Sequence, residues 1–123
     1  MIHHRRTPEG AEQLAREIQA LGRKAEILAG DLSDVNVPVR IIDEAFEKMG
    51  RLDVLVNNAG ITIFKPFLEM DLEQLELCYK VDFRAAFLCA QRVAQLMVET
   101  GTRSDGDIGA APPSAGSQSL TAA

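Results

Sequence analysis

The sequence contains few of the residues that build metal sites and disulfides. Its 123 residues include two Cys, two His and one Tyr, and Trp is absent. No Cys-x-x-Cys pair and no cluster of Cys and His occurs, so we predict no metal site. Basic residues number 13 against 18 acidic ones, for a net charge of −5. This balance argues against nucleic acid as a partner, because nucleic-acid surfaces are usually basic.

Long apolar stretches are also missing. No run approaches the ~20 residues that a membrane-spanning helix needs, and the N-terminus has no apolar signal-peptide core. The composition, 46% hydrophobic and 25% charged, is typical of a soluble globular protein. We therefore predict one domain, located in the cytoplasm, that neither spans nor binds a membrane.

The few Cys and His residues have structural interpretations. Cys78 and Cys89 are eleven residues apart in a predicted helix, which places them roughly 16 Å apart along its axis. A disulfide needs Cα atoms within about 7 Å, so we expect two small buried apolar side chains instead. Adjacent side chains of a strand point to opposite faces, so we interpret His3 and His4 as the end of a strand.

Hydrophobic periodicity predicts an alternation of strands and helices. Apolar residues recur every three to four positions in the helical segments, and Gly22 and Gly50 follow the first two of them. Such an alternation is typical of an α/β fold with a parallel sheet. The expected strands are 1–4, 25–29 and 52–56, and the expected helices are 8–21, 34–49 (or 36–49) and 71–98.

The composition changes at Thr100. Between this residue and position 123, only Ile108 and Leu120 are large and apolar. Such a segment buries too little surface to offset its ordering entropy, so we predict a domain over 1–99 and a disordered tail over 100–123. A flexible linker to another domain is the alternative interpretation.

The most informative motif is Asn57-Asn58-Ala59-Gly60, directly after the apolar strand predicted at 52–56. Small residues such as Ala59 and Gly60 let the backbone approach a flat ligand closely. Gly30-Asp31-Leu32 follows the preceding strand in the same way, and Glu47–Asp53 links the two regions. With these three segments, the sequence resembles the short-chain dehydrogenase/reductase family.

The resemblance covers about residues 1–99 and implies a partial Rossmann-like fold, a doubly wound parallel sheet. It corresponds to strands 2–4 of the family with their helices, so the first strand and the C-terminal half are not included. In the strand order 3-2-1-4-5-6 the first strand is central. Its absence leaves a gap of roughly 9.6 Å, twice the strand spacing. We therefore expect Leu52–Val56 either to move into this gap or to keep unpaired edges.

The same resemblance implies a site for NAD(P). Asp31 and Leu32 fall where the family contacts adenine, and the segment Asn57–Gly60 borders the cofactor. Arg5 and Arg6 follow the second strand, where the family reads the adenosine ribose. A guanidinium suits a 2′-phosphate, so these residues favour NADP over NAD. The alternative interpretation is two solvated arginines at the entrance of a helix.

The family's glycine-rich turn, catalytic Ser and Tyr-x-x-x-Lys pair have no counterpart here. Tyr79 is the only tyrosine, and Phe83 stands four residues after it. Asp82 occupies the family's catalytic Asn position, where a carboxylate can still hold a water. We therefore predict an inactive, truncated relative of an NAD(P)-dependent oxidoreductase, whose own cofactor binding is in doubt. The alternative is an interaction fragment that joins or poisons oligomers of full-length relatives through helix 71–98.

Overall fold

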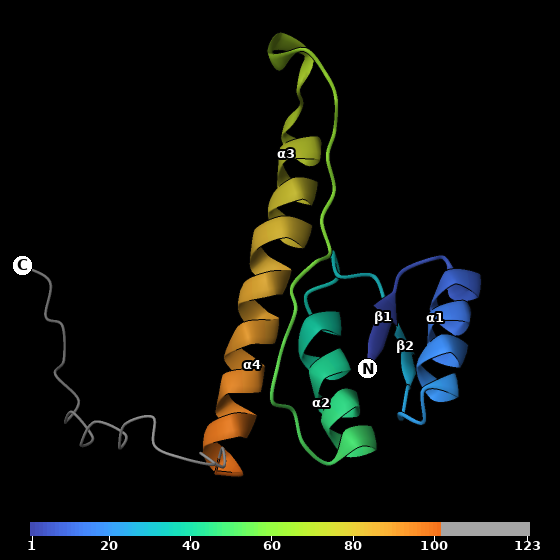
Figure 1. Cartoon of the computed structure of the whole chain (residues 1–123). Coiled ribbons are helices and arrows are strands. Elements are labelled where there is room, and N and C mark those ends of the chain that lie inside the picture. The colour runs from blue at the N-terminus through green and yellow to red at the C-terminus, as the bar shows by residue number, and fades with distance from the viewer. Residues whose placement is uncertain (102–123) are drawn as a thin grey trace, which may run out of the picture.

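The computed structural model describes residues 1–101 and shows a small parallel sheet with helices on both sides (Figure 1). The predicted α/β class is therefore confirmed. The predicted disordered tail falls almost entirely on residues 102–123, outside the described residues, and stays a prediction. The elements in chain order are β1 (Ile2–His4), α1 (Pro8–Ala20), β2 (Ile27–Ala29), α2 (Val37–Met49), the 3₁₀ turn η1 (Phe67–Glu69), α3 (Leu72–Cys78), the π-helical η2 (Tyr79–Ala85) and α4 (Ala86–Glu99).

The first two helices begin and end near the predicted positions. Each has a proline in its first turn, where the missing N–H costs no helical hydrogen bond. Gly22 has φ +72° just after α1, and Gly50 has φ +78° at the end of α2. Glycine adopts this left-handed conformation without steric cost, so both positions stop a helix.

The sheet consists of β1 and β2 in parallel, with Ile2 opposite Ile27 and His4 opposite Ala29. Figure 1 shows the two strands between α1 and α2. Leu28 of β2 is 5% exposed and packs with Ile41 of α2. Burial on both sides of the sheet is the arrangement expected for parallel strands.

One long helical rod follows, formed by α3, η2 and α4 (Figure 1). The predicted capping box is present: the Asp71 side chain accepts from the Gln74 backbone N–H at 2.9 Å, and the Asp71 N–H donates to the Gln74 side chain. The π-helical turns in the middle of the rod were not predicted. The buried face of α4 packs on α2 through Val93 and Ile42. Arg92 Nε also donates to Asp43 Oδ1 at 2.6 Å across this contact.

The predicted strand at Leu52–Val56 is wrong. Within residues 1–101 the sheet has only the strands β1 and β2. Leu52 and Leu55 pack against the cores around α2 and α4. Val54 and Val56 are each 77% exposed. In the described part of the chain, this segment therefore joins no strand ladder; Leu52 and Leu55 hold it by packing, and Asp53 pairs with Arg51.

The cysteine expectations are met in part. Both thiols are free, as the helical spacing predicts, and Cys89 is buried, whereas Cys78 is only half-buried. Burial raises the pKa of the Cys89 thiol above its ordinary value.

Within the described part of the chain, no helix is both long enough and apolar enough to cross a membrane.

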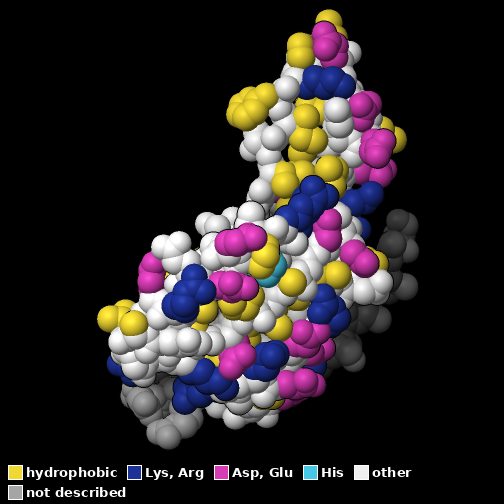
Figure 2. Space-filling view, turned by 90° about the vertical axis from the view of Figure 1, so that its right-hand side faces the viewer, with side chains coloured by type: hydrophobic (Ala, Val, Ile, Leu, Met, Phe, Trp, Pro, Cys, Tyr) yellow, Lys and Arg dark blue, Asp and Glu magenta, His cyan; other side chains and the backbone are white. Residues whose placement is uncertain are grey.

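The first part of the rod and the loop before it project beyond the rest of the molecule (Figure 1). Figure 2 shows hydrophobic side chains gathered on this projecting arm. Among them Phe64 is 94%, Phe67 90% and Leu68 94% exposed. These side chains have almost no partners in the isolated chain.

Candidate functional site

A cleft of about 260 Å³ lies at the carboxyl ends of β1 and β2. Ligands of open α/β sheets usually bind at this edge. We call it the carboxyl-edge cleft. Its lining residues come from three segments that are distant in sequence and from one residue of η2: His3, His4, Arg5, Gly30, Asp31, Leu32, Ala59, Gly60, Ile61 and Val81.

Asp31 is the acidic group of the cleft. Its Oδ1 accepts from the Ser33 backbone N–H at 2.9 Å and from the Ser33 hydroxyl at 2.7 Å. Its Oδ2 forms an ion pair with Arg5 Nε at 3.2 Å. The hydrogen bonds from Ser33, and then the positive charges of Arg5 and Arg6, hold the pKa of Asp31 below its ordinary value. The carboxylate is therefore charged at neutral pH.

The two arginines are placed differently. Arg5 lines the carboxyl-edge cleft beside Asp31, and its side chain is 39% exposed. Arg6 is exposed and is not among the lining residues. Of the pair singled out from the sequence, the structure brings only Arg5 into the cleft.

The turn that carries Asp31 is fixed from two directions. Arg84 of η2 donates to the Ser33 carbonyl at 2.6 Å, across 51 residues of sequence. On the other side, a Cβ at Gly30 would lie 2.5 Å from Val37 Cγ1, so glycine is required there for close packing. Sequence reasoning missed Arg84; a basic residue beside the buried Val81 and Ala85 was the only signal.

The segment Asn57–Gly60 is divided between two sites. Ala59 and Gly60 line the carboxyl-edge cleft, whereas Asn57 and Asn58 line a neighbouring groove beside β1. The Asn57 amide donates to the Ala86 carbonyl at 3.3 Å. Ala59 and Gly60 of this motif thus line the cleft, and the Asn57 side chain binds the first residue of α4.

Asp82 is exposed on η2, and its Oδ1 accepts from the Ile61 N–H at 2.8 Å. It therefore fixes the backbone immediately after Gly60. π-Helical turns are often found at functional sites, and here they present both Asp82 and Arg84 toward the loops of the cleft. The structure brings Asp82 to the edge of the cleft through Ile61, which lines it.

Comparison with known proteins decides the family. The sequence matches the model of the family described as short chain dehydrogenase over residues 1–119. The chain belongs to the short-chain dehydrogenase family. The resemblance in the segments around Asp31 and Gly60 is thereby confirmed, and the fold is a partial Rossmann-like one.

Relatives within the short-chain dehydrogenase family are similar over most of the chain. An uncharacterized oxidoreductase, YohF, of Escherichia coli (strain K12) is 40% identical over 76% of this chain and 37% of its own length. The acetoin dehydrogenase structure from Enterobacter cloacae has a TM-score of 0.76 at 40% identity, over 81% of this chain and 41% of that one. A short chain dehydrogenase from Burkholderia cenocepacia in complex with NADP has a TM-score of 0.74 at 30% identity, over 76% and 38%. The chain thus spans about two-fifths of the length of these short-chain dehydrogenases.

Replacing Ser33 by Ala should raise the pKa of Asp31 toward the ordinary 3.8, because the hydroxyl donor is lost. A carboxyl group with a lowered pKa stabilises the fold above its ordinary pKa, and this contribution is lost as pH falls through the lowered value. In the Ser33→Ala chain, this contribution should be smaller, and its loss should be complete at a higher pH. Carbon-detected NMR titration of the Asp31 carboxyl measures the change. Thr100→Ala, at the far end of α4, should leave the titration unmoved; an unchanged curve for Ser33→Ala would contradict the assignment.

Proposed function

We propose that the chain forms the adenosine-binding part of an NAD(P)-dependent short-chain oxidoreductase. The observation that carries this proposal is the carboxyl-edge cleft, in which Asp31 and Leu32 lie together with Ala59 and Gly60. An acidic and an apolar side chain at one wall, with small residues at the other, suit a flat base that also offers hydrogen bonds.

An unpartnered buried nitrogen supports the fit of a polar ligand. The Nδ1 atom of His4 is buried and has no hydrogen-bond partner among the described residues. His4 lines the carboxyl-edge cleft, and its backbone carbonyl is already engaged with the Gly30 N–H at 3.2 Å. Buried polar atoms normally have partners, so a ligand hydroxyl or ring nitrogen would complete this site.

Arg5 favours NADP over NAD in this proposal. Its guanidinium lies at the cleft beside Asp31, where a 2′-phosphate would compete for it as a charge-assisted partner. Asp31 would then hold Arg5 in position when no phosphate is bound. The NADP complex of the Burkholderia cenocepacia relative is consistent with this choice.

The bound cofactor would supply hydride transfer at its nicotinamide. We propose that Asp82 fixes the loop after Gly60 through the Ile61 N–H, while its second carboxylate oxygen holds a water. The 123 residues contain no Tyr-x-x-x-Lys pair. We therefore propose that this chain binds adenosine phosphates without catalysing turnover.

We also propose that the protein is located in the cytoplasm. Both cysteines are free thiols, which fits this reducing compartment.

Calorimetric titration with adenosine 2′,5′-bisphosphate and adenosine 5′-monophosphate tests the proposal. The first ligand should bind more tightly, and Arg5→Ala should reduce that preference by about tenfold, as expected for loss of a charge-assisted contact. Arg6→Ala is the matched control, because Arg6 is not a lining residue, and it should keep most of the preference. Equal effects of the two substitutions would contradict the placement of Arg5, and no binding of either ligand would contradict the function.

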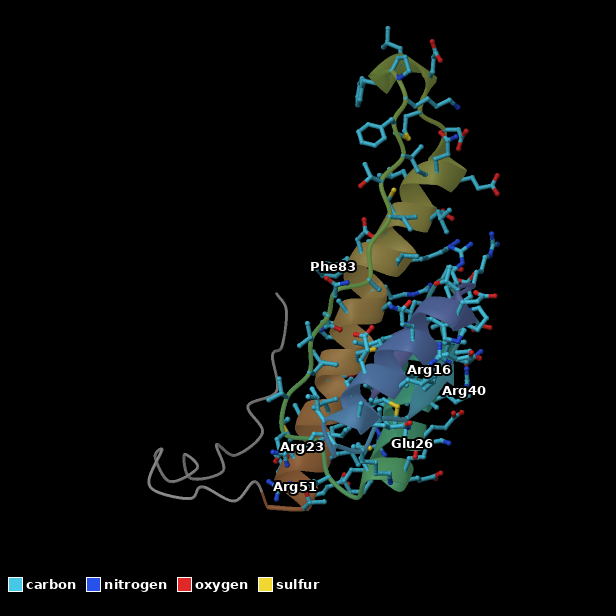
Figure 3. All side chains as sticks on the ribbon, turned by 45° about the vertical axis from the view of Figure 1, so that its right-hand side comes forward. Arg16, Arg23, Glu26, Arg40, Arg51 and Phe83 are labelled. Atoms are coloured by element: carbon cyan, nitrogen blue, oxygen red, sulfur yellow. The ribbon has the colours of Figure 1, made fainter. Side chains whose placement is uncertain are left out.

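A second candidate function is association with full-length relatives through the rod formed by α3, η2 and α4. Tyr79, Phe83 and Phe87 stack along it with centroid separations of 5.6 and 6.5 Å, and each is more than half exposed. Figure 3 shows Phe83 on the side of the rod away from α1. Contiguous exposed aromatic surface is typical of protein interfaces. Co-purification with a full-length reductase, lost in Phe83→Lys, would favour this candidate.

A further inference from the structure

Arg84 of η2 does not line the carboxyl-edge cleft, but a continuous series of hydrogen bonds connects it to the cleft. Its guanidinium donates to the Ser33 carbonyl at 2.6 Å. Taking the function proposed above as given, we propose that Arg84 is a positioning residue for the adenosine ligand. It sets the wall of the cleft that contains Asp31, and together with Asp82 it makes η2 a common support for both walls.

Ser33 connects Arg84 to the acidic group of the cleft. The Ser33 backbone N–H and hydroxyl donate to Asp31 Oδ1 at 2.9 and 2.7 Å. Both donors and the carbonyl that accepts from Arg84 belong to this one residue, so movement of Ser33 would displace the Asp31 carboxylate. Arg5 would follow, because its Nε is paired with Asp31 Oδ2 at 3.2 Å. Arg84 thus controls both charged groups of this wall without touching the cleft.

The same part of η2 holds the other wall. Asp82 accepts from the Ile61 N–H at 2.8 Å, in the loop after Gly60. Val81, one residue earlier, lines the cleft itself and is 6% exposed. Residues two apart on a helix do not face each other, which lets Asp82 and Arg84 reach two different loops. The two walls therefore share one support, and loss of one contact should be felt at the other wall.

The surroundings of Arg84 indicate that this contact does more than stabilise the fold. Within residues 1–101 its Nε is buried and has no hydrogen-bond partner, and an unpartnered buried donor costs stability. Arg92, which ties α4 to α2, is different, because it pairs with the Asp43 carboxylate at 2.6 Å. Arg84 holds a neutral carbonyl instead. Its main effect is therefore on the position of that carbonyl and of the turn that contains it.

NMR hydrogen exchange of the full 123-residue chain, measured without ligand, tests the contacts. Arg84→Met keeps an unbranched side chain but removes the guanidinium. Exchange of the Ser33 amide should accelerate by about tenfold. Exchange of the Ile61 amide should accelerate as well, because both walls rest on η2. Arg84→Lys can still donate to the carbonyl, so it should restore most of the protection.

Arg92→Met is the matched control, because it removes an arginine contact of the same length from the same rod. It should leave the Ser33 and Ile61 amides unchanged relative to the amides of α1, which report a general loss of stability. If Arg84→Met accelerates the α1 amides as much as the Ser33 amide, the contact is merely structural and the proposal is wrong. An unchanged Ile61 amide in Arg84→Met would overturn the common support.

Calorimetric titration with adenosine 2′,5′-bisphosphate measures the consequence for the ligand. Arg84→Met should weaken binding by about tenfold, as expected when the charge-assisted contact of Arg5 is misplaced, whereas Arg92→Met should not. Equal affinities of Arg84→Met and the unmodified chain would overturn the role of Arg84 in ligand binding. If the unmodified chain binds no ligand while the amides respond as expected, the proposed function is wrong and the positioning of the two walls by Arg84 is supported.

Discussion

The Val93→Asp chain is expected to lose its helical structure at neutral pH. Val93 of α4 is 3% exposed and packs against Ile42 of α2, in the main contact between the rod and the rest of the fold. An unpaired carboxylate buried there costs several kcal/mol. That cost is comparable to the whole stability of a small domain, roughly 5–15 kcal/mol. Circular dichroism at the helical minimum and dispersion of the amide NMR spectrum measure the loss.

Val98→Asp is the control for this prediction. Val98 lies five residues later on the same helix and is 80% exposed, so the same change of side chain buries no charge there. It should keep the helical circular dichroism and the amide dispersion of the unmodified chain, since exposed substitutions usually alter stability by less than about 0.5 kcal/mol. Equal spectra for the two variants would show that α4 does not pack on α2 in solution.

Helix boundaries were predictable because their causes are local in sequence. Gly22 and Gly50 adopt positive φ within two residues of a helix end, and Asp71 forms a capping box with Gln74 within a single turn. Such signals depend on neighbouring residues and on the steric freedom of glycine, both of which are visible in the sequence.

The strand predicted at Leu52–Val56 failed for a non-local reason. Its composition suits a buried strand, but a strand forms only where a neighbour supplies hydrogen bonds. Here the neighbouring space is a groove bordered by Met1–His3 and Leu55–Ala59, and the apolar side chains of Leu52 and Leu55 pack on the helices instead. The expectation of unpaired edges describes this segment better than its own hydrophobic pattern does.

The residues that line the candidate site could be predicted from the sequence, but the long-range contacts that hold them in place could not. Asp31, Leu32, Ala59 and Gly60 could be assigned from short motifs, and the structure brings them into one cleft. The contacts that fix those motifs could not be found in this way. Arg84 reaches the carbonyl of a residue 51 positions earlier, and no local pattern encodes that pairing.

Removing the Asp82 carboxylate is expected to free the loop after Gly60. In Asp82→Ala, the Ile61 N–H loses its acceptor at 2.8 Å, which is the hydrogen bond that ties this loop to η2. Hydrogen exchange of the Ile61 amide should accelerate by about tenfold, in the range expected for a bond to a charged acceptor. Amide exchange followed by NMR measures it residue by residue, and amides of α1 should serve as unaffected references.

Asp82→Asn separates the charge of this residue from its role as an acceptor. The amide oxygen of Asn can accept from the Ile61 N–H as the carboxylate does, so most of the protection should return. If Asp82→Asn fully restores protection of the Ile61 amide, this position needs an oxygen acceptor and not a negative charge. The Asn that the family usually has at this position would supply the same oxygen acceptor. Equal exchange in Asp82→Ala and the unmodified chain would show that another contact holds the loop. The two variants thus decide whether Asp82 positions the edge of the carboxyl-edge cleft, independently of any measurement of turnover.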